Sequence, residues 1–573
     1  MANIQIDHIS NRINLAAAAG LCLYLLLIGK IYTKQIMQHD HYLSLATSQH
    51  LWQEEEKARR GQIYDINGYP LAANLSLPAL EIIPNQVDDA EYAARKISTV
   101  MHLSRQEESD IKAKIATKAL YMPPIKHKLT DEETKEIKEL GLGGVLLLPE
   151  DWRFYPEGSL GAQVVGFLDY EGEGQYGIEG YFNDELMGSS GFVQSYKDLT
   201  GREISDSQEV LEKVRQGLNL YLTIDRTVQY FVEAKLKEAV ERYQADGGSV
   251  VIVDPKTGKV IAMANYPTYN PNEYGKVENY DSFNNGIVSS SWEPGSVFKV
   301  ITMAAAIDKD LITPDTAETF GASIKVLDRE IWNSERRPYG RETMTQVLEN
   351  SDNVGMVWVG QKLGKDNFYN YLYKFGFGDP TNIDLPNESA GSVVDKSAVS
   401  EVDLATMTFG QGIAVTPIQM VTAVGVIANG GYLRKPYIVD KIMTVDGKEV
   451  KVEPEITRSV LDPDSANSVT AMMVAVVENG HGKQAGVDGY YVAGKTGTAQ
   501  VPINGVYDAH KTIGSFVGFA PALDPKFVML VKIDVPKTTE WAESSAAPVF
   551  GEIAKFMLDY YMVPPDRHDQ GEK

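Results

Sequence analysis

The sequence predicts an α+β protein with an N-terminal transmembrane helix, a β-rich domain and a larger domain in which helices cover an antiparallel sheet. Three observations predict this fold class. Residues 13–29 form an uncharged apolar run. Residues 59–217 contain hairpin-like runs and many glycine-rich turns. From Asp225 onward come patterns typical of a helix, two strands, a long helical middle, three strands and a last helix, which is the order expected of a helix-covered sheet.

The apolar run is just long enough, over residues 13–32, to cross a bilayer once. No small-residue cleavage site follows it, which favours an uncleaved anchor over a signal peptide that is removed. Arg12 precedes the uncharged run, and Lys30 and Lys34 follow it, so positive charge does not decide the orientation. We place residues 1–12 in the cytoplasm because the chemistry that the motifs indicate belongs outside it.

The composition excludes several classes of function. A net charge of −24 over 573 residues argues against a nucleic acid partner, because a phosphate-binding surface needs an excess of Lys and Arg. The single cysteine, Cys22, cannot form an internal disulfide. The nine histidines form no His-x-x-x-His pair and no phosphate-cradling loop is present, so the sequence predicts no metal and no cofactor.

The β-rich domain is predicted to span residues 33–220. Residues 33–58 are polar and predicted to be helical, and Asn67-Gly68 between apolar runs predicts a tight hairpin turn. Residues 88–140 predict solvated helices, and strand-like runs resume at 144–148.

The larger domain is predicted to span residues 221–563, and Asp225 can cap its first helix. Residues 564–573 are polar and predicted to be disordered. Strands are expected at 249–253, 260–264, 490–501, 515–519 and 527–535, and a last helix carries Val549, Ile553, Phe556 and Tyr560 on one face.

Three motifs occur in one order: Ser296-Val297-Phe298-Lys299, Ser351-Asp352-Asn353 and Lys495-Thr496-Gly497-Thr498. Each is weak alone, but the ordered set is typical of serine acyl-transferases. Pro294 and Gly295 precede an apolar run, so Ser296 should lie in the first turn of a helix with Lys299 one turn further. A serine hydroxyl needs a base. Burial and a nearby positive charge would lower the pKa of Lys299 enough for that role. An exposed Ser and Lys on an amphipathic helix is the alternative, and the apolar residues that follow disfavour it.

The other two motifs supply the expected relay and substrate contacts. Ser351 can relay a proton, and Asn353 can bind a substrate carbonyl and a lysine, although such residues before a helix are also ordinary N-caps. Asp352 should point away. Lys495, Thr496, Gly497 and Thr498 are expected to bind a peptide carboxylate along a strand edge, with Gly494 and Gly497 permitting its close approach. The N–H groups of Ser296 and Thr498 would form an oxyanion hole. A glycine bulge without a ligand is the alternative.

These motifs resemble those of the class B penicillin-binding proteins, most closely the division-type (FtsI-like) peptidoglycan D,D-transpeptidases. Glu293-Pro294-Gly295 and Asn353-Val354-Gly355 resemble division rather than elongation enzymes. The resemblance implies a pedestal (PBP dimerisation) domain at 33–220 and a serine β-lactamase-like, penicillin-binding transpeptidase domain at 221–563. Further matching segments are RRGQIYDINGYPLA at 59–72, RFYPEGSLGAQVVGF at 153–167, GGSVVIVDPKTGKVIAMANYPTYNPN at 247–272, FGFGDPTNIDLPNE at 375–388 and FGQGIAVTPIQM at 409–420.

The resemblance implies that Ser296 attacks the D-Ala–D-Ala bond of a stem peptide and that an amine of a neighbouring stem then accepts the acyl group. β-Lactams would acylate the same serine, and no cofactor is needed. The implied catalytic residues are Ser296, Lys299, Ser351, Asn353 and Lys495, and the implied substrate-binding residues are Thr496, Gly497 and Thr498.

The resemblance also implies a single-pass protein of the cytoplasmic membrane with an extracytoplasmic catalytic domain. An FtsW-type glycosyltransferase and other divisome proteins are the implied partners, contacting the anchor and the hairpins near 60–72 and 153–181. An elongation-type transpeptidase is one alternative. A β-lactamase would not need an anchor and a pedestal, and a β-lactam sensor would have several membrane segments.

Overall fold

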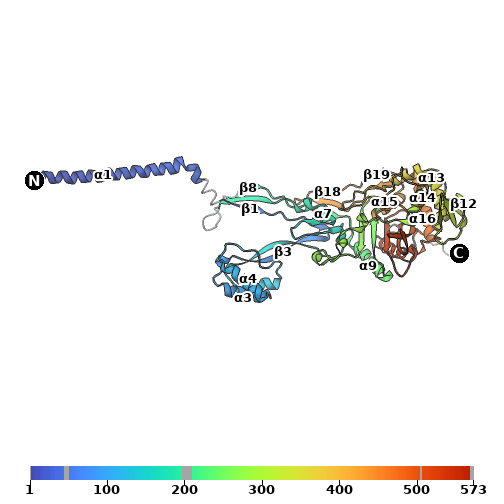
Figure 1. Cartoon of the computed structure of the whole chain (residues 1–573), viewed down its shortest axis with the longest axis horizontal. Helices are drawn as coiled ribbons and strands as arrows, with labels where there is room; N and C mark the ends of the chain where they lie inside the picture. The colour runs from blue at the N-terminus through green and yellow to red at the C-terminus, as the bar shows by residue number, and fades with distance from the viewer. Residues whose placement is uncertain (1, 44–50, 197–208, 504–505, 568–573) are drawn as a thin grey trace. The chain divides into compact units, whose positions relative to one another are not determined.

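The computed structural model describes residues 2–43, 51–196, 209–503 and 506–567 (Figure 1). Contacts group the chain into two compact units, Met1–Arg59 with Gly188–Gly217 and Arg60–Met187 with Leu218–Lys573. These limits differ from the predicted boundary at 220/221, because residues on both sides of it share one sheet in the second unit.

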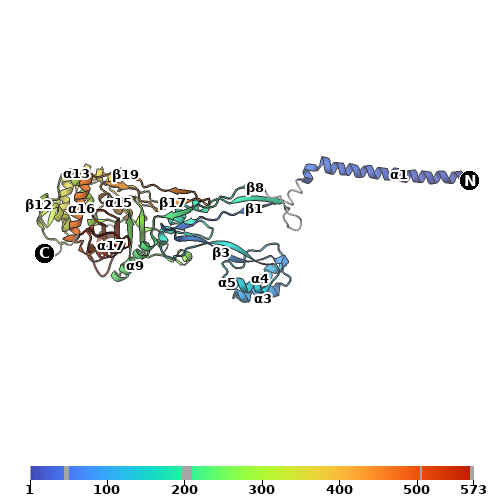
Figure 2. The same ribbon diagram turned by 180° about the vertical axis from the view of Figure 1, so that it is seen from behind.

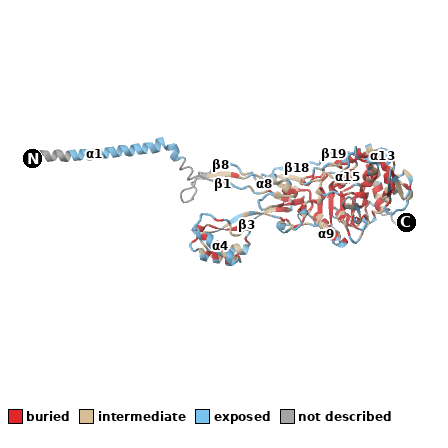
Figure 3. Cartoon of the chain, viewed as in Figure 1, coloured by how far each residue is buried: buried red, intermediate tan, exposed pale blue. Residues whose placement is uncertain are grey.

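The first unit begins with helix α1 (Ala2–Tyr32), which continues into a π-helical turn, η1 (Thr33–Met37). The segment Asn11–Met37 is long and apolar enough to cross a membrane, and its residues are exposed (Figure 3). The predicted apolar span at 13–32 is therefore helical, and the helix starts before it.

The rest of the first unit is a three-stranded antiparallel sheet of β1 (Leu51–Glu56), β7 (Gly191–Tyr196) and β8 (Glu209–Glu212). The prediction of a helix over 33–58 is thus wrong for Leu51–Glu56, because pairing with β7 outweighs the weak strand preference of glutamate and glutamine. Residues 44–50 of that prediction lie outside the described residues.

The second unit contains a six-stranded sheet in the order β18-β17-β9-β2-β3-β4, in which only the β2–β9 pair is parallel. The turn predicted at Asn67-Gly68 joins β2 to β3, and Gly68 adopts the positive φ that the turn requires. The strands are β2 (Ile63–Tyr64), β3 (Pro70–Ile82), β4 (Val145–Phe154), β9 (Asn219–Leu222), β17 (Val439–Met443) and β18 (Glu449–Lys451).

Three capped helices pack on β3 and β4, as the charged segment 88–140 predicts. Ile97, Ile111 and Ile137 are buried against Leu80 and Ile82, while most other helix residues face solvent. The helices are α3 (Ala90–Val100), α4 (Arg105–Ala116) and α5 (Asp131–Leu140), with N-caps at Asp89, Ser104 and Thr130.

The predicted helix-covered sheet is present, in the order β11-β10-β22-β21-β20 and antiparallel throughout. Along β10, Val250 and Ile252 face one cluster of core residues, and Val251 and Val253 face the other. The strands are β10 (Gly247–Val253), β11 (Val260–Tyr266), β20 (Ala493–Ile503), β21 (Val506–Ala520) and β22 (Phe527–Asp534).

Helices α9 (Arg226–Tyr243) and α17 (Ala546–Tyr560) cover one face of this sheet (Figure 2). Phe231 of α9 stacks on Phe556 of α17, and Asp225 caps α9 as predicted. The longer helices of the other layer are α11 (Lys299–Asp308), α13 (Asn353–Lys374), α15 (Pro417–Ala428) and α16 (Pro463–Glu478).

The region between the two groups of strands is not entirely helical. It includes the antiparallel pairs β12 (Ala317–Phe320) with β15 (Gly340–Thr343), β13 (Ser323–Val326) with β14 (Arg329–Trp332), and β16 (Tyr432–Arg434) with β19 (Ile456–Ser459). Short elements elsewhere are β5 (Phe167–Leu168), β6 (Gly174–Gln175), α6 (Ala162–Val165), α7 (Gly177–Tyr181), α8 (Asn183–Met187), α10 (Gly286–Ser289), α12 (Met344–Glu349) and α14 (Glu401–Met407).

The predicted disordered tail is wrong for its first part. Asp566 Oδ1 accepts a 2.9 Å hydrogen bond from the Tyr491 N–H, and Arg567 pairs with Glu478 at 3.0 Å, so these contacts hold the segment on the second unit. Residues 568–573 lie outside the described residues.

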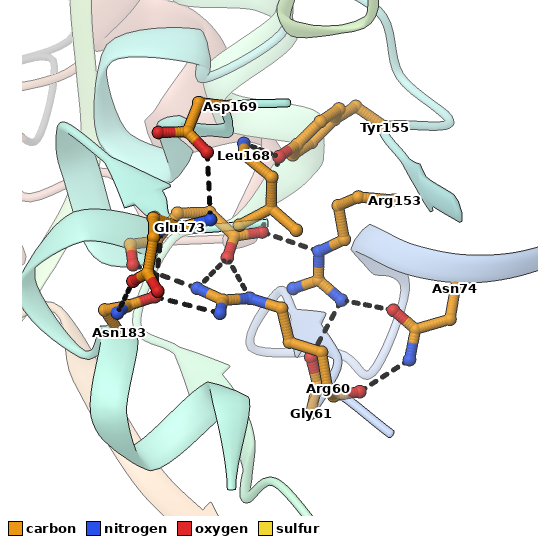
Figure 4. Close-up of polar contacts among 11 residues, drawn as sticks. Arg60, Gly61, Asn74, Arg153, Tyr155, Leu168, Asp169, Glu173 and Asn183 are labelled. Atoms are coloured by element: carbon orange, nitrogen blue, oxygen red, sulfur yellow. Dashed lines mark hydrogen bonds and ion pairs between the residues drawn. The ribbon is translucent and has the colours of Figure 1, made fainter. Parts of the chain in front are cut away.

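A buried ion-pair cluster joins the two segments that the sequence suggests as partner surfaces (Figure 4). Glu179 is fully buried and accepts hydrogen bonds from Arg60 Nε at 2.8 Å and Arg153 Nε at 2.6 Å. Arg153 also donates to Asn74 Oδ1. These charged side chains therefore hold the domain together internally, whereas Tyr181 in the same region is 47% exposed.

Candidate active site

Ser296 lies in a 3-10 turn, η5 (Gly295–Phe298), that leads directly into α11, as the sequence predicts. Gly295 has φ +56°, and a side chain there would lie 3.2 Å from Thr498 O of β20. Ser296 itself is partly exposed, while Val297 and Phe298 are buried. The turn therefore leaves Ser296 partly open to solvent beside β20.

Lys299 is fully buried one turn after Ser296. Its Nζ donates to Ser351 O at 2.6 Å and Asn353 Oδ1 at 2.7 Å, and it lies 3.2 Å from Ser351 Oγ. Burial, followed by the positive charge of Lys495, holds the pKa of Lys299 well below its usual value, while the Asp352 carboxylate opposes that shift. Within the described residues no hydrogen bond joins Lys299 to the Ser296 hydroxyl.

The second motif forms the turn between α12 and α13. Ser351 has φ +53°, and Asp352 caps α13 by accepting a 2.7 Å hydrogen bond from the Gly355 N–H. Asp352 thus turns away from the lysines' hydrogen bonds, as expected. Asn353 also donates from Nδ2 to Trp332 O at 3.0 Å, so its amide oxygen faces Lys299.

The third motif lies on β20. Lys495 is fully buried, and its Nζ donates to Ser351 Oγ at 3.0 Å and to Thr496 O at 3.0 Å. Burial lowers its pKa to about 7, against the opposing charge of Glu543. Thr498 Oγ1 accepts a hydrogen bond from the Ala542 N–H, which leaves its own O–H free to donate.

The glycines of β20 have a reason within the protein itself that the sequence did not predict. A Cβ at Gly497 would lie 2.9 Å from Pro294 O and Val297 Cγ1, and one at Gly494 would lie 2.3 Å from the Phe516 ring. A close approach that requires glycine is therefore made by the protein's own nucleophile turn and core.

The structure thus brings together all eight predicted site residues: Ser296, Lys299, Ser351, Asn353, Lys495, Thr496, Gly497 and Thr498. It adds Asn333, which sequence reasoning missed. Asn333 is buried and its Oδ1 accepts from the N–H groups of Asn353 at 3.0 Å and Val354 at 3.2 Å. A lone asparagine directly after β14 carries no pattern that would have identified it. Among the described residues no group of three or more His, Cys, Asp or Glu could hold a metal ion.

Family comparisons agree with this geometry. The penicillin binding protein transpeptidase domain matches residues 248–555, more than half of the chain, and the penicillin-binding protein dimerisation domain matches residues 55–222. "Stage V sporulation protein D" of Bacillus subtilis (strain 168) is 35% identical over 567 residues, covering 97% of this chain and 86% of the relative. "Peptidoglycan D,D-transpeptidase FtsI" of Escherichia coli (strain K12) is 29% identical over 577 residues, covering 99% and 95%.

Solved structures show the same architecture. Penicillin binding protein 3 from Mycobacterium tuberculosis, complexed with aztreonam, is 29% identical with a TM-score of 0.71 over 90% of this chain and 98% of its own. A peptidoglycan synthetase from Bifidobacterium adolescentis is 27% identical with a TM-score of 0.74, over 91% and 98%. The chain therefore belongs to the class B penicillin-binding proteins and is a β-lactam-binding peptidoglycan D,D-transpeptidase.

Proposed function

We propose that this transpeptidase cross-links stem peptides at the division septum through an ester on Ser296. The observation that carries the catalytic part is the position of one hydroxyl, Ser351 Oγ, within 3.2 Å of both buried lysine amines beside the accessible Ser296. Such an arrangement can take a proton from one group and return it to another without bulk water.

In the first half-reaction, Ser296 Oγ attacks the carbonyl carbon of the penultimate D-Ala, and its proton moves to neutral Lys299. A neutral amine has two N–H bonds, which suit the two short contacts to Ser351 O and Asn353 Oδ1 and leave the lone pair for the serine. The C–N bond to the last D-Ala then breaks. The leaving nitrogen takes a proton from Ser351 Oγ. Lys299 then gives Ser351 Oγ the proton that it took from Ser296.

In the second half-reaction, the amine of a neighbouring stem attacks the ester carbonyl and the bond to Ser296 Oγ breaks. The proton that the amine loses passes through Ser351 and Lys299 back to Ser296. The product is a new amide and the free enzyme. A β-lactam opens its ring in the first half-reaction, but its leaving group stays attached, which hinders the second.

Substrate orientation is assigned to β20. Lys495, when protonated, and the hydroxyls of Thr496 and Thr498 would bind the terminal carboxylate. The N–H groups of Ser296 and Thr498 would stabilise the oxyanion, because the Gly295 turn lies against Thr498.

The cellular arrangement extends the proposal. Residues 1–12 would lie in the cytoplasm, 13–32 would cross the membrane, and the pedestal (33–220) and transpeptidase (221–563) domains would lie outside. The apolar helix α1 supports this arrangement. An FtsW-type glycosyltransferase and other divisome proteins would be the partners.

A sporulation role is the second candidate, because the 35% identical relative is named a sporulation protein. Depletion of the protein from growing cells separates the roles. Filaments with unclosed septa are expected for septal synthesis. Normal growth with failure only in spore formation would instead support the sporulation role, and round, swelling cells would place the protein in elongation.

A further inference from the structure

We propose that Glu342 is a positioning residue: its carboxyl group carries a proton shared with Asp352, and this shared proton holds the Ser351-Asp352-Asn353 turn in place. The inference rests on the proposed catalytic role of that turn. The mechanism assigns no proton transfer to either carboxyl group.

The two carboxyl groups meet in the interior. Glu342 lies on β15 and is 3% exposed, and Asp352 at the start of α13 is 0% exposed. Asp352 is among the groups that raise the pKa of Glu342, so the two carboxyl groups are neighbours. Each has one oxygen with an outside donor: Asn350 Nδ2 donates to Glu342 Oε1 at 2.5 Å, and the Gly355 N–H donates to Asp352 Oδ1 at 2.7 Å.

The remaining oxygens, Glu342 Oε2 and Asp352 Oδ2, are buried and have no hydrogen-bond partner. Two ionised carboxylates cannot satisfy each other, because both only accept hydrogen bonds. One proton between them turns one group into a donor and satisfies both oxygens. Burial first, and the Asp352 carboxyl group in addition, raise the pKa of Glu342 to about 7, which agrees with a proton held on Glu342 below that pH.

This proton affects the catalytic groups through Asp352. The Asp352 side chain caps α13, whose first residue, Asn353, contacts Lys299. The Asp352 charge also raises the pKa of Lys299. Loss of the shared proton would place a second negative charge behind the turn, which strains the cap and makes Lys299 harder to deprotonate.

Other charged groups surround the pair. Glu349 at the end of α12 adds a negative charge that also raises the pKa of Glu342. Lys299 on α11 faces Asp352, and Lys495 on β20 acts on Lys299. Burial and the charges of Glu335 and Asp352 raise the pKa of Tyr339, while Arg337 lowers it. Lys495 titrates in the same pH range as Glu342, so every test below compares variants that retain Lys495.

The first test compares the Glu342→Gln variant with wild type, both as full-length proteins in detergent. The melting temperature of each is measured by tryptophan fluorescence at a series of pH values. The folded pKa is raised from 4.5 to about 7, so the stability from the held proton is lost as pH rises between these values. The neutral amide donates to Asp352 at every pH. The melting temperature of the variant relative to wild type should therefore rise by at least about 2 °C between about pH 5 and about pH 8.

The control is Glu318→Gln, the exposed residue opposite Glu342 on β12, which should show no such rise. A difference between Glu342→Gln and wild type that stays constant with pH would overturn the proposal. This readout does not depend on acyl transfer, so it fails or holds independently of the proposed function.

The second test is a double-mutant cycle with Asp352→Asn, which keeps an acceptor for the Gly355 N–H and offers an amide N–H to Glu342. Either single variant should remove the pH-dependent part of the melting temperature, and the double variant should remove no more. Additive effects of the two substitutions on the pH-dependent part of the melting temperature would overturn the proposal of a shared proton. If one variant does not fold, the other tests the same pair alone.

The third test is the rate of acylation by penicillin, which separates positioning from mere stability. The ratio of Glu342→Gln to wild-type rate should be near one at about pH 6 and at least roughly threefold at about pH 9, because only wild type gains the second charge. A ratio that does not change with pH would contradict the positioning role.

Discussion

Ser351 Oγ accepts a hydrogen bond from Lys495 Nζ over 3.0 Å, although 144 residues separate the two side chains. The same oxygen lies 3.2 Å from Lys299 Nζ. One hydroxyl thus joins the three motifs into a single polar network at the base of the Ser296 turn. Changes at any member are expected to affect acylation more than folding.

Ser296→Ala should abolish covalent labelling by a fluorescent penicillin while leaving the melting temperature close to that of wild type. Ser296 is partly exposed, and no hydrogen bond in the described part of the chain depends on its hydroxyl. Gel fluorescence after labelling checks this result. Covalent label that persists on another serine of the variant would refute the assignment.

Lys299→Ala should slow acylation by about a hundredfold or more, which is the usual contribution of a positioned base. The buried amine has its pKa lowered by burial and by Lys495, so it is the group suited to accept the Ser296 proton. Stopped-flow labelling measures the rate. Lys309→Ala, beyond the exposed end of α11, is the matched control and should react like wild type.

The sequence predicts the site residues well because each motif is local and its chemistry is fixed by residue type. The pairing of β17 with β9 could not be predicted, since the two strands lie far apart in the sequence and neither has an unusual pattern. The need for glycine at position 497 could not be predicted either. It comes from the Pro294–Val297 turn, which packs against β20 in the folded protein. The buried partners Asn333 and Glu342 look like ordinary surface residues in the sequence.

Carboxylate binding should weaken as pH rises above about 7, because the pKa of Lys495 is lowered to about 7 and only its protonated form attracts an anion. The dissociation constant of the Ser296→Ala protein for benzylpenicillin, measured by calorimetry, should increase toward a limit of tenfold per pH unit. The methyl ester of the same compound lacks the anion and should bind independently of pH. Equal pH profiles for acid and ester would remove Lys495 from this role.

Arg60→Glu should destabilise the second unit by about 3–5 kcal/mol, because it leaves Glu179 without one buried cation and adds a like charge. Thermal unfolding of the full-length protein checks this. Lys57→Glu reverses an exposed charge nearby in the sequence and should change stability little. Matching melting temperatures for the two variants would show that the buried cluster of Arg60, Arg153 and Glu179 is not needed for stability.

Tyr181→Ala should fail to support division as the only copy of the protein, while penicillin labelling stays near normal. Tyr181 is exposed at the end of α7, next to the buried cluster, so a change there can alter a docking surface without loss of the ion pairs that hold the domain. Microscopy of septa and labelling of membranes from the same cells give the two measurements. Tyr230→Ala, an exposed tyrosine on α9, is the matched control and should divide normally. If both variants support septum closure equally, the region around 153–181 does not contact the polymerase, and the proposed partner must bind elsewhere, with the membrane helix as the next surface to test.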